Sequence, residues 1–142
     1  MNIESIEIVN GKIITPAGII ANGCIRIEDG KITDIMDSPS GSADLLSIDA
    51  QGKYVSPGFI DLHVHGGGGA DFMDGDVESF LTIADTHARF GTTSLMPSTL
   101  TSEKEDLITT FENYEKAISL NKSGAQFIGL HLEGPYFSME QR

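Results

Sequence analysis

The chain of 142 residues is 39% hydrophobic and 21% charged and carries a net charge of −12, a composition typical of a globular protein rather than of a disordered one. Its 21 acidic residues against nine basic ones argue against nucleic acid or an anionic membrane as a partner. No apolar run approaches the ~20 residues that cross a bilayer, and the first residues lack the basic and apolar parts of a signal peptide. With Cys24 as the single cysteine no internal disulfide can form, so we expect a cytoplasmic protein.

Residues 1–52 contain short apolar segments that we expect to pair as antiparallel strands. Asn10-Gly11 predicts a first two-residue hairpin turn, and Asp29-Gly30 predicts a second. A polar loop at 38–43 precedes the last segment. The expected strands are residues 6–9, 12–15, 24–28, 31–36 and 45–48. Together they form a small β-unit that is too thin to bury much core alone.

From residue 53 the pattern changes to strands that alternate with helices. Such alternation predicts parallel strands joined by right-handed helical crossovers. A doubly wound sheet and a (β/α)8 barrel both begin this way. The expected elements are a strand at 54–65, a helix at 76–90, a strand at 92–97, a helix from Ser102 to about residue 121 and a strand at 125–132.

The boundaries of these elements carry local signals. The first strand is a continuous apolar run, as strands buried on both faces are. Asp74 or Asp76 can cap the first helix, and Gly91 can end it. Ser102 and Glu105 form a capping box at the start of the second helix. The expected buried face of that helix is Leu107, Phe111, Tyr114 and Ile118.

Two histidines, His63 and His65, stand at the end of the first parallel strand. Residues two apart on a strand point to the same face, so both imidazoles can bind one ion such as Zn²⁺ or Fe²⁺. The alternative is two polar side chains hydrogen-bonded to the neighbouring loop. Asp61, on the same face, either fixes an imidazole or bridges local backbone, which is the simpler role. The four glycines 66–69 either admit a ligand or form a loose loop.

Glu133 ends the third parallel strand, two residues after His131. Carboxyl ends of parallel strands form the face where α/β active sites lie. In a (β/α)8 barrel, alternate strands contribute to one interior layer. His63, His65 and Glu133 are therefore expected to converge on one point, which favours a metal site.

Other reactive side chains have simpler interpretations. His87 lies within a helix and is expected to be a surface or packing residue. Cys24 is expected to be a small buried or half-buried side chain. Ser98 and Thr99, like the serines at 56 and 94, have no nucleophile-elbow context.

Two segments resemble known families. The segment 49–65, Asp-Ala-x-Gly-x-x-Val-x-Pro-Gly-Phe-Ile-Asp-x-His-x-His, resembles the start of the barrel in the amidohydrolase superfamily. The segment 129–136, Gly-Leu-His-Leu-Glu-Gly-Pro-Tyr, narrows the resemblance to the N-acetylglucosamine-6-phosphate deacetylases. The similarity covers the whole chain in order.

This resemblance implies an α/β fold: residues 53–142 as the first three β/α units of a (β/α)8 barrel, and residues 1–52 as the N-terminal part of a small β-sandwich domain. It implies a metal-dependent hydrolase that removes the acetyl group from N-acetylglucosamine 6-phosphate, giving glucosamine 6-phosphate and acetate. Glu133 corresponds to a metal ligand, and His63 and His65 to a pair that binds a second metal in some members. One or two ions, Zn or Fe, are expected.

Family members continue with further metal-binding histidines and a catalytic aspartate, which we expect beyond Arg142. The chain is therefore expected to be an N-terminal part with no useful activity alone, and to self-associate through its open sheet edge as a homo-oligomer. Its partner is expected to be a small amino sugar phosphate. The alternatives are another amidohydrolase, such as a cyclic amidase or a deaminase, and a non-catalytic truncated assembly module.

Overall fold

The computed structural model describes residues 5–39, 45–134, 138 and 140. The chain divides into two compact units, Met1–Pro57 and Gly58–Arg142. In the described residues, the first unit contains strands and no helix, and the second contains strands that alternate with helices. The division of the chain into domains after residue 52 stays a prediction.

The first unit is a sheet with the strand order β3-β2-β1-β4, in which β5 also pairs with β1. The hairpin of β2 and β3 turns at Asp29 and Gly30, both at positive φ, as predicted. The expectation of antiparallel pairing is wrong for β4, which runs parallel to β1. β5, the start of the segment predicted as a strand at 54–65, also pairs parallel with β1. The strands are β1 (Ser5–Thr15), β2 (Gly18–Glu28), β3 (Lys31–Met36), β4 (Leu46–Asp49) and β5 (Tyr54–Val55).

The predicted turn at Asn10-Gly11 is wrong, because β1 continues through it. Asn10 has a φ of 56°, and the pairing of β1 with β2 shifts register on both sides of Gly11. A Cβ at Gly11 would lie 2.7 Å from Cγ2 of Val55. The positive φ and the missing side chain therefore produce a bulge that lets β5 approach. The predicted loop 38–43 lies outside the described residues from position 40 on.

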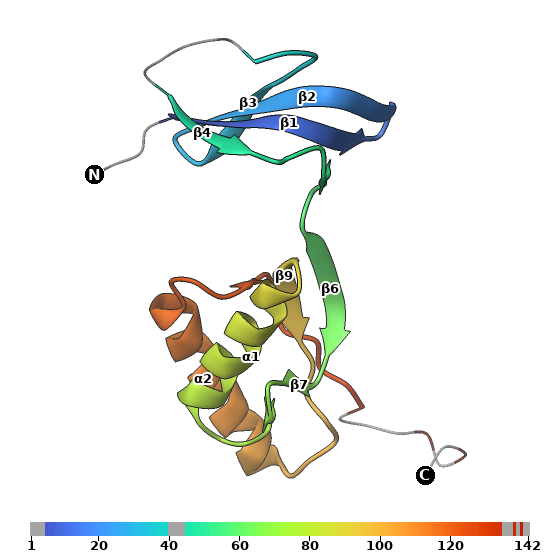
Figure 1. Cartoon of the computed structure of the whole chain (residues 1–142). Coiled ribbons are helices and arrows are strands. Elements are labelled where there is room, and N and C mark those ends of the chain that lie inside the picture. The colour runs from blue at the N-terminus through green and yellow to red at the C-terminus, as the bar shows by residue number, and fades with distance from the viewer. Residues whose placement is uncertain (1–4, 40–44, 135–137, 139, 141–142) are drawn as a thin grey trace. The chain divides into compact units, whose positions relative to one another are not determined.

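The second unit contains three parallel strands in the order β10-β9-β6, with α1 and α2 side by side on one face of this sheet (Figure 1). The predicted order of strand, helix, strand, helix, strand is confirmed. The short β7 and β8 form a separate hairpin after β6. The elements are β6 (Phe59–Val64), β7 (Gly66–Gly67), β8 (Ala70–Asp71), α1 (Val77–Arg89), β9 (Thr92–Pro97), α2 (Lys104–Leu120) and β10 (Gln126–Phe127).

The core of this unit lies between the helices and the sheet. Helix α1 begins as predicted, because Oδ1 of Asp76 accepts a hydrogen bond from the backbone N–H of Ser79 at 2.8 Å. It ends before Gly91, which has a φ of 94°. No helix in the described ranges is long and apolar enough to cross a membrane. The buried core residues are Phe72, Phe80, Ile83, Ala84, Leu95, Ala117, Ala125 and Phe127.

Helix α2 differs from its prediction at the start and in its buried face. It begins at Lys104, and the hydroxyl of Ser102 donates a hydrogen bond to the Asp106 carboxylate at 2.7 Å, so the predicted capping box is wrong. Leu107 and Tyr114 are half-buried, whereas Phe111 and Ile118 are exposed. The residues buried on α2 are the small or polar Thr110, Asn113 and Ala117. A small side chain such as Ala117 lets the helix pack closely, which turns the larger apolar residues outward.

Two predicted strands are shorter than expected. The segment 54–65 splits into β5 and β6, and Phe59, Ile60 and Leu62 of β6 are 69%, 63% and 58% exposed. The predicted burial of this strand on both faces is therefore wrong. Among the described residues β6 pairs only with β9, so its other edge is uncovered. The third strand is reduced to β10 and an isolated bridge between Ser98 and His131.

Candidate metal centre

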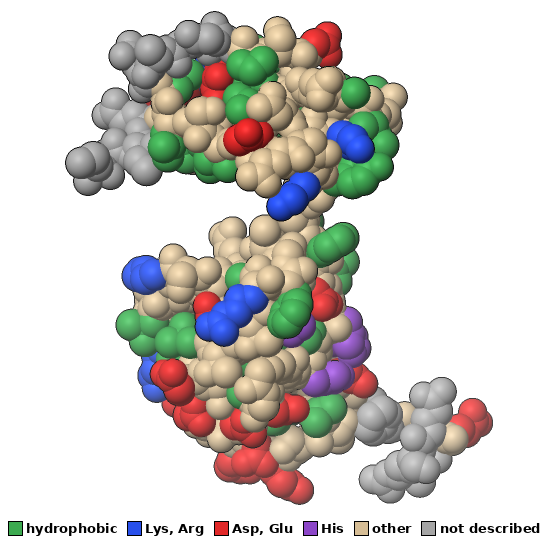
Figure 2. All heavy atoms as spheres, viewed as in Figure 1, with side chains coloured by type: hydrophobic (Ala, Val, Ile, Leu, Met, Phe, Trp, Pro, Cys, Tyr) green, Lys and Arg blue, Asp and Glu red, His purple; other side chains and the backbone are tan. Residues whose placement is uncertain are grey.

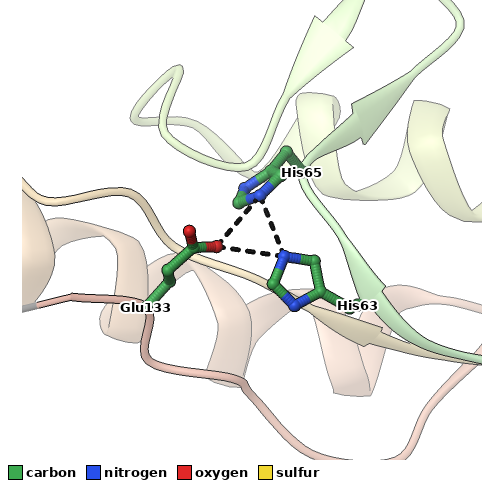
Figure 3. Close-up of side chains that lie close together, drawn as sticks. All are labelled: His63, His65 and Glu133. Atoms are coloured by element: carbon green, nitrogen blue, oxygen red, sulfur yellow. Dashed lines mark hydrogen bonds and ion pairs between the residues drawn. The ribbon is translucent and has the colours of Figure 1, made fainter.

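Three side chains, two from the end of β6 and one from the segment that follows β10, converge on one point (Figure 3). His63 lies in β6, His65 follows its last residue, and Glu133 follows the bridge residue His131. The two Nε2 atoms are 3.2 Å apart. Oε2 of Glu133 lies 3.0 Å from Nε2 of His63 and 3.1 Å from Nε2 of His65. The predicted convergence of these residues is therefore present in the structure.

This triangle of donors fits a divalent ion. Two ligand atoms of a tetrahedral zinc ion, each ~2.1 Å from it, are about 3.4 Å apart, close to the three separations here. Oε2 of Glu133 is buried and, among the described residues, takes part in no hydrogen bond despite its short contacts with the imidazoles. A buried carboxylate oxygen without a donor is costly unless a cation neutralises it. Two imidazoles and a carboxylate are a donor set that zinc uses in sites with an open fourth position.

A hydrogen bond orients His65. Its Nδ1 lies 3.2 Å from the carbonyl oxygen of Ser98. A carbonyl only accepts, so Nδ1 carries the hydrogen, which leaves the lone pair of Nε2 directed at the other donors. This contact between a ligand's second nitrogen and a backbone carbonyl is the usual support of a metal-binding histidine.

His63 is held in a different way. Its ring packs against the ring of His131, with centroids 4.8 Å apart and planes tilted by 52°. Asp61 does not orient the imidazole in the described contacts: its Oδ1 accepts a hydrogen bond from the backbone N–H of His63 at 3.1 Å. The simpler of the two interpretations of Asp61 is therefore confirmed. Figure 2 shows histidine side chains grouped on the surface of the second unit.

The chain is similar in sequence to curated sugar-phosphate deacetylases, although no family model matches it. It is 34% identical over 139 residues to the N-acetylglucosamine-6-phosphate deacetylase of Bacillus subtilis, an alignment that covers 95% of this chain and 35% of that protein. It is 31% identical over 131 residues to the N-acetylgalactosamine-6-phosphate deacetylase of Escherichia coli O157:H7, covering 92% of this chain and 33% of that one.

The fold agrees with these relatives. The crystal structure of N-acetylglucosamine-6-phosphate deacetylase from Pasteurella multocida matches with a TM-score of 0.87 and 31% identity, over 96% of this chain and 36% of that one. The chain is homologous to the N-terminal part of the N-acetylglucosamine-6-phosphate deacetylases. These enzymes belong to the amidohydrolase superfamily. The chain spans about a third of the length of the curated relatives it matches.

Of the four glycines that follow His65 in this deacetylase homologue, Gly66, Gly67 and Gly68 are closely packed, whereas Gly69 has open space around it. A Cβ at Gly66 would lie 2.2 Å from the backbone oxygen of Ala70, within the β7–β8 hairpin. Nε2 of His87 on α1 lies 3.2 Å from the carbonyl oxygen of Gly66, and the imidazole also fills the space beside Gly67. Gly67 and Gly68 allow close packing against α1, and the prediction of a packing role for His87 is confirmed.

In the first unit of the homologue, Cys24 is fully buried, as expected. Burial raises the pKa of the Cys24 thiol, and the neighbouring Glu7 carboxylate raises it further. Glu7 is also buried and forms an ion pair with Arg26 on β2, with Oε1 and Nη2 2.8 Å apart. A buried thiol with a raised pKa is unreactive, so Cys24 is a packing residue.

Sequence reasoning missed the part that Ser98 and Thr99 play beside the site. Both are buried and directly follow β9, the middle strand of the sheet. Ser98 contacts the chain around His65, and Thr99 contacts Glu133. The available signal was their position, because they are polar residues directly after a strand whose two neighbouring strands lead into the segments with His65 and Glu133.

Proposed function

We propose that this chain provides part of the metal site of an amide hydrolase that removes the acetyl group from N-acetylglucosamine 6-phosphate. The observation that carries the proposal is the convergence of Nε2 of His63, Nε2 of His65 and Oε2 of Glu133 within 3.0–3.2 Å. The homology to deacetylases supports the class of reaction. The products would be glucosamine 6-phosphate and acetate.

Each of the three residues has a defined part in this proposal. His63 and His65 supply neutral nitrogen donors, and Glu133 supplies an oxygen donor and the negative charge that favours a divalent cation. Such an ion, zinc or iron, supplies Lewis-acid polarisation of a carbonyl and a water of lowered pKa. The proposed site holds one ion or two. Proton transfer to the leaving amine is assigned to the catalytic aspartate that the family resemblance implies beyond Arg142.

We further propose that the second unit is the start of a (β/α)8 barrel, with residues 1–52 as part of a β-sandwich domain. Both helices lie on the same face of the sheet, and the strands follow one another in chain order (Figure 1). A doubly wound sheet places helices on both faces. The arrangement therefore favours the barrel.

A second candidate substrate is N-acetylgalactosamine 6-phosphate, because a relative of similar identity acts on it by name. The two sugars differ in the configuration of one hydroxyl group. The metal that the three residues are proposed to hold acts on the amide rather than on this hydroxyl, so the site is compatible with either sugar. A cyclic amidase, a deaminase or a non-catalytic module are the alternatives that the test has to separate.

The test is a chimaera in which this chain replaces the matching third of the Bacillus subtilis deacetylase. Release of acetate is measured from both acetamido sugar phosphates, and hydrolysis is measured on a cyclic amide. We expect acetate release that is lost in the Glu133→Gln variant. A folded chimaera that hydrolyses only the cyclic amide, or that keeps full deacetylase activity with Glu133→Gln, would contradict the proposal. The 142-residue chain alone is expected to release little acetate.

A further inference from the structure

We propose that Thr99 and Thr101 are positioning residues, whose hydroxyl groups hold Glu133 at the metal site. This inference rests on the proposed function, since it concerns one of the proposed ligands. The backbone N–H of Glu133 donates a hydrogen bond to Oγ1 of Thr99 at 3.2 Å. Oγ1 of Thr101 donates a hydrogen bond to the carbonyl oxygen of Gly134 at 2.6 Å. The main chain is thus held at Glu133 and at the residue after it.

Glu133 needs such support because it lies outside regular secondary structure. Strand β10 ends at Phe127, and pairing with the end of β9 resumes only at His131. There the N–H of His131 donates to the Pro97 carbonyl at 2.7 Å, and the N–H of Thr99 donates to the His131 carbonyl at 2.9 Å. Beyond His131, in the described part of the chain, side-chain hydroxyls take the place of the sheet's backbone hydrogen bonds.

Burial makes the Thr99 contact effective. Thr99 is 1% exposed, so water competes little for its hydroxyl group. Its own N–H is bonded to the His131 carbonyl, and its Oγ1 is bonded to the Glu133 N–H. One buried residue therefore bonds the main chain on both sides of Leu132. This fixes the backbone from which the Glu133 side chain extends.

The same segment also orients a ligand on the other neighbouring strand. Ser98, one residue earlier, accepts a hydrogen bond from Nδ1 of His65. The segment Ser98 to Thr101 contains none of the proposed ligands. It nevertheless forms hydrogen bonds at or beside two of them, His65 and Glu133. Because metal sites tolerate deviations of only about 0.2 Å in ligand distance, a shift of the Glu133 backbone should weaken binding without unfolding the chain.

The test compares Thr99→Val with Thr99→Ser in the full 142-residue chain. Valine keeps the shape of threonine and removes the hydroxyl acceptor, whereas serine keeps it. Zinc affinity, the visible absorption spectrum of the Co²⁺ form and the thermal midpoint are measured for each. We expect Thr99→Val to weaken zinc binding about 10–100-fold and to change the Co²⁺ spectrum, and Thr99→Ser to restore both. A purely structural role would lower the thermal midpoint and leave the Co²⁺ spectrum unchanged.

Two further variants keep the result interpretable. Thr101→Val changes an exposed residue, so this variant should fold even if Thr99→Val does not. We expect Thr101→Val to weaken zinc binding several-fold, because it removes the hydrogen bond to the Gly134 carbonyl. Thr109→Val, which removes a hydroxyl bonded to the Glu105 carbonyl on α2, should leave zinc binding unchanged. Wild-type zinc affinity and Co²⁺ spectrum in Thr99→Val or in Thr101→Val would overturn the positioning role alone. Absence of ion binding by the unsubstituted chain would instead overturn the proposed metal site, and this role with it.

Discussion

Ser98 and His65 make the contact that orders the candidate metal centre: the Ser98 carbonyl oxygen lies 3.2 Å from Nδ1 of His65. Ser98 is fully buried at the end of β9. Its N–H donates to the Val64 carbonyl at 2.8 Å, and its hydroxyl accepts a hydrogen bond from the Val64 N–H at 3.2 Å. The end of β6 is therefore tied to β9 by both backbone and side chain, directly beside a proposed ligand.

Ser98→Ala separates these two contributions. The variant loses the hydroxyl that accepts from the Val64 N–H and keeps the carbonyl that orients His65. We expect a loss of about 1 kcal/mol in the free energy of unfolding, measured by urea denaturation, with nearly unchanged zinc affinity. A folded variant that no longer binds zinc would show that the carbonyl alone does not orient the imidazole.

Gly66→Ala should destabilise the second unit. The new Cβ would meet the Ala70 backbone oxygen at 2.2 Å, and relief of such overpacking costs about 1–3 kcal/mol. Gly69→Ala is the matched control, because open space surrounds its Cβ and only its φ of 86° opposes the change. Urea denaturation should show the larger loss for Gly66→Ala. Equal stability of Gly66→Ala and wild type would mean that the hairpin is not packed as described.

Cys24 should resist alkylation in the native state. Its thiol is fully buried, and burial and Glu7 raise its pKa, so little thiolate is present near pH 8. Because the pKa of the Cys24 thiol is higher in the folded chain than in the unfolded chain, ionisation of this thiol opposes folding. Its contribution to the free energy of unfolding is fully present below about pH 8.5, the ordinary pKa of a thiol. This contribution is lost as the pH rises through the pKa of the folded state. Mass spectrometry should find slow labelling by iodoacetamide in buffer and rapid labelling in urea. Fast native labelling would contradict the burial.

Self-association of the chain stays a prediction, and the structure shows where to test it. Phe59, Ile60 and Leu62 on β6 are mostly exposed, on a strand that pairs only with β9 among the described residues. Light scattering at rising concentration should show oligomers, and Leu62→Lys should reduce them, since a charge on an edge strand opposes pairing. A stable monomer at high concentration would count against the prediction.

Much of the site could be predicted from sequence, because its signals are local. The two-residue spacing of His63 and His65 places both on one face of a strand whatever the fold, and the strand–helix alternation places Glu133 at the same edge of the sheet. The part played by Thr99 could not be predicted in this way. It depends on β9 lying between β6 and β10 and on where β10 ends, which are properties of strand register.

Other differences have equally physical causes. At Asn10-Gly11 the same positive φ suits a turn and a bulge, and the packing of Val55 against Gly11 decides between them. The apolar run of β6 predicts burial, but burial requires a partner that the sequence of the strand does not specify. On α2, the small Ala117 lets the helix pack closely against the core, so the face with Ala117 is buried and the larger Phe111 is exposed.

The most direct test of the proposed metal site is a calorimetric titration of zinc into the 142-residue chain. The wild-type chain is compared with Glu133→Gln and with the control Glu115→Gln, which changes an exposed residue on α2. Both variants make the same chemical change, and only the first removes a proposed ligand. We predict zinc binding by the wild-type chain and by Glu115→Gln, and a loss of more than about 100-fold in affinity for Glu133→Gln, since removal of supporting residues alone costs 10–100-fold. Equal affinity of Glu133→Gln and wild type, or no zinc binding by the wild-type chain, would contradict the proposed site.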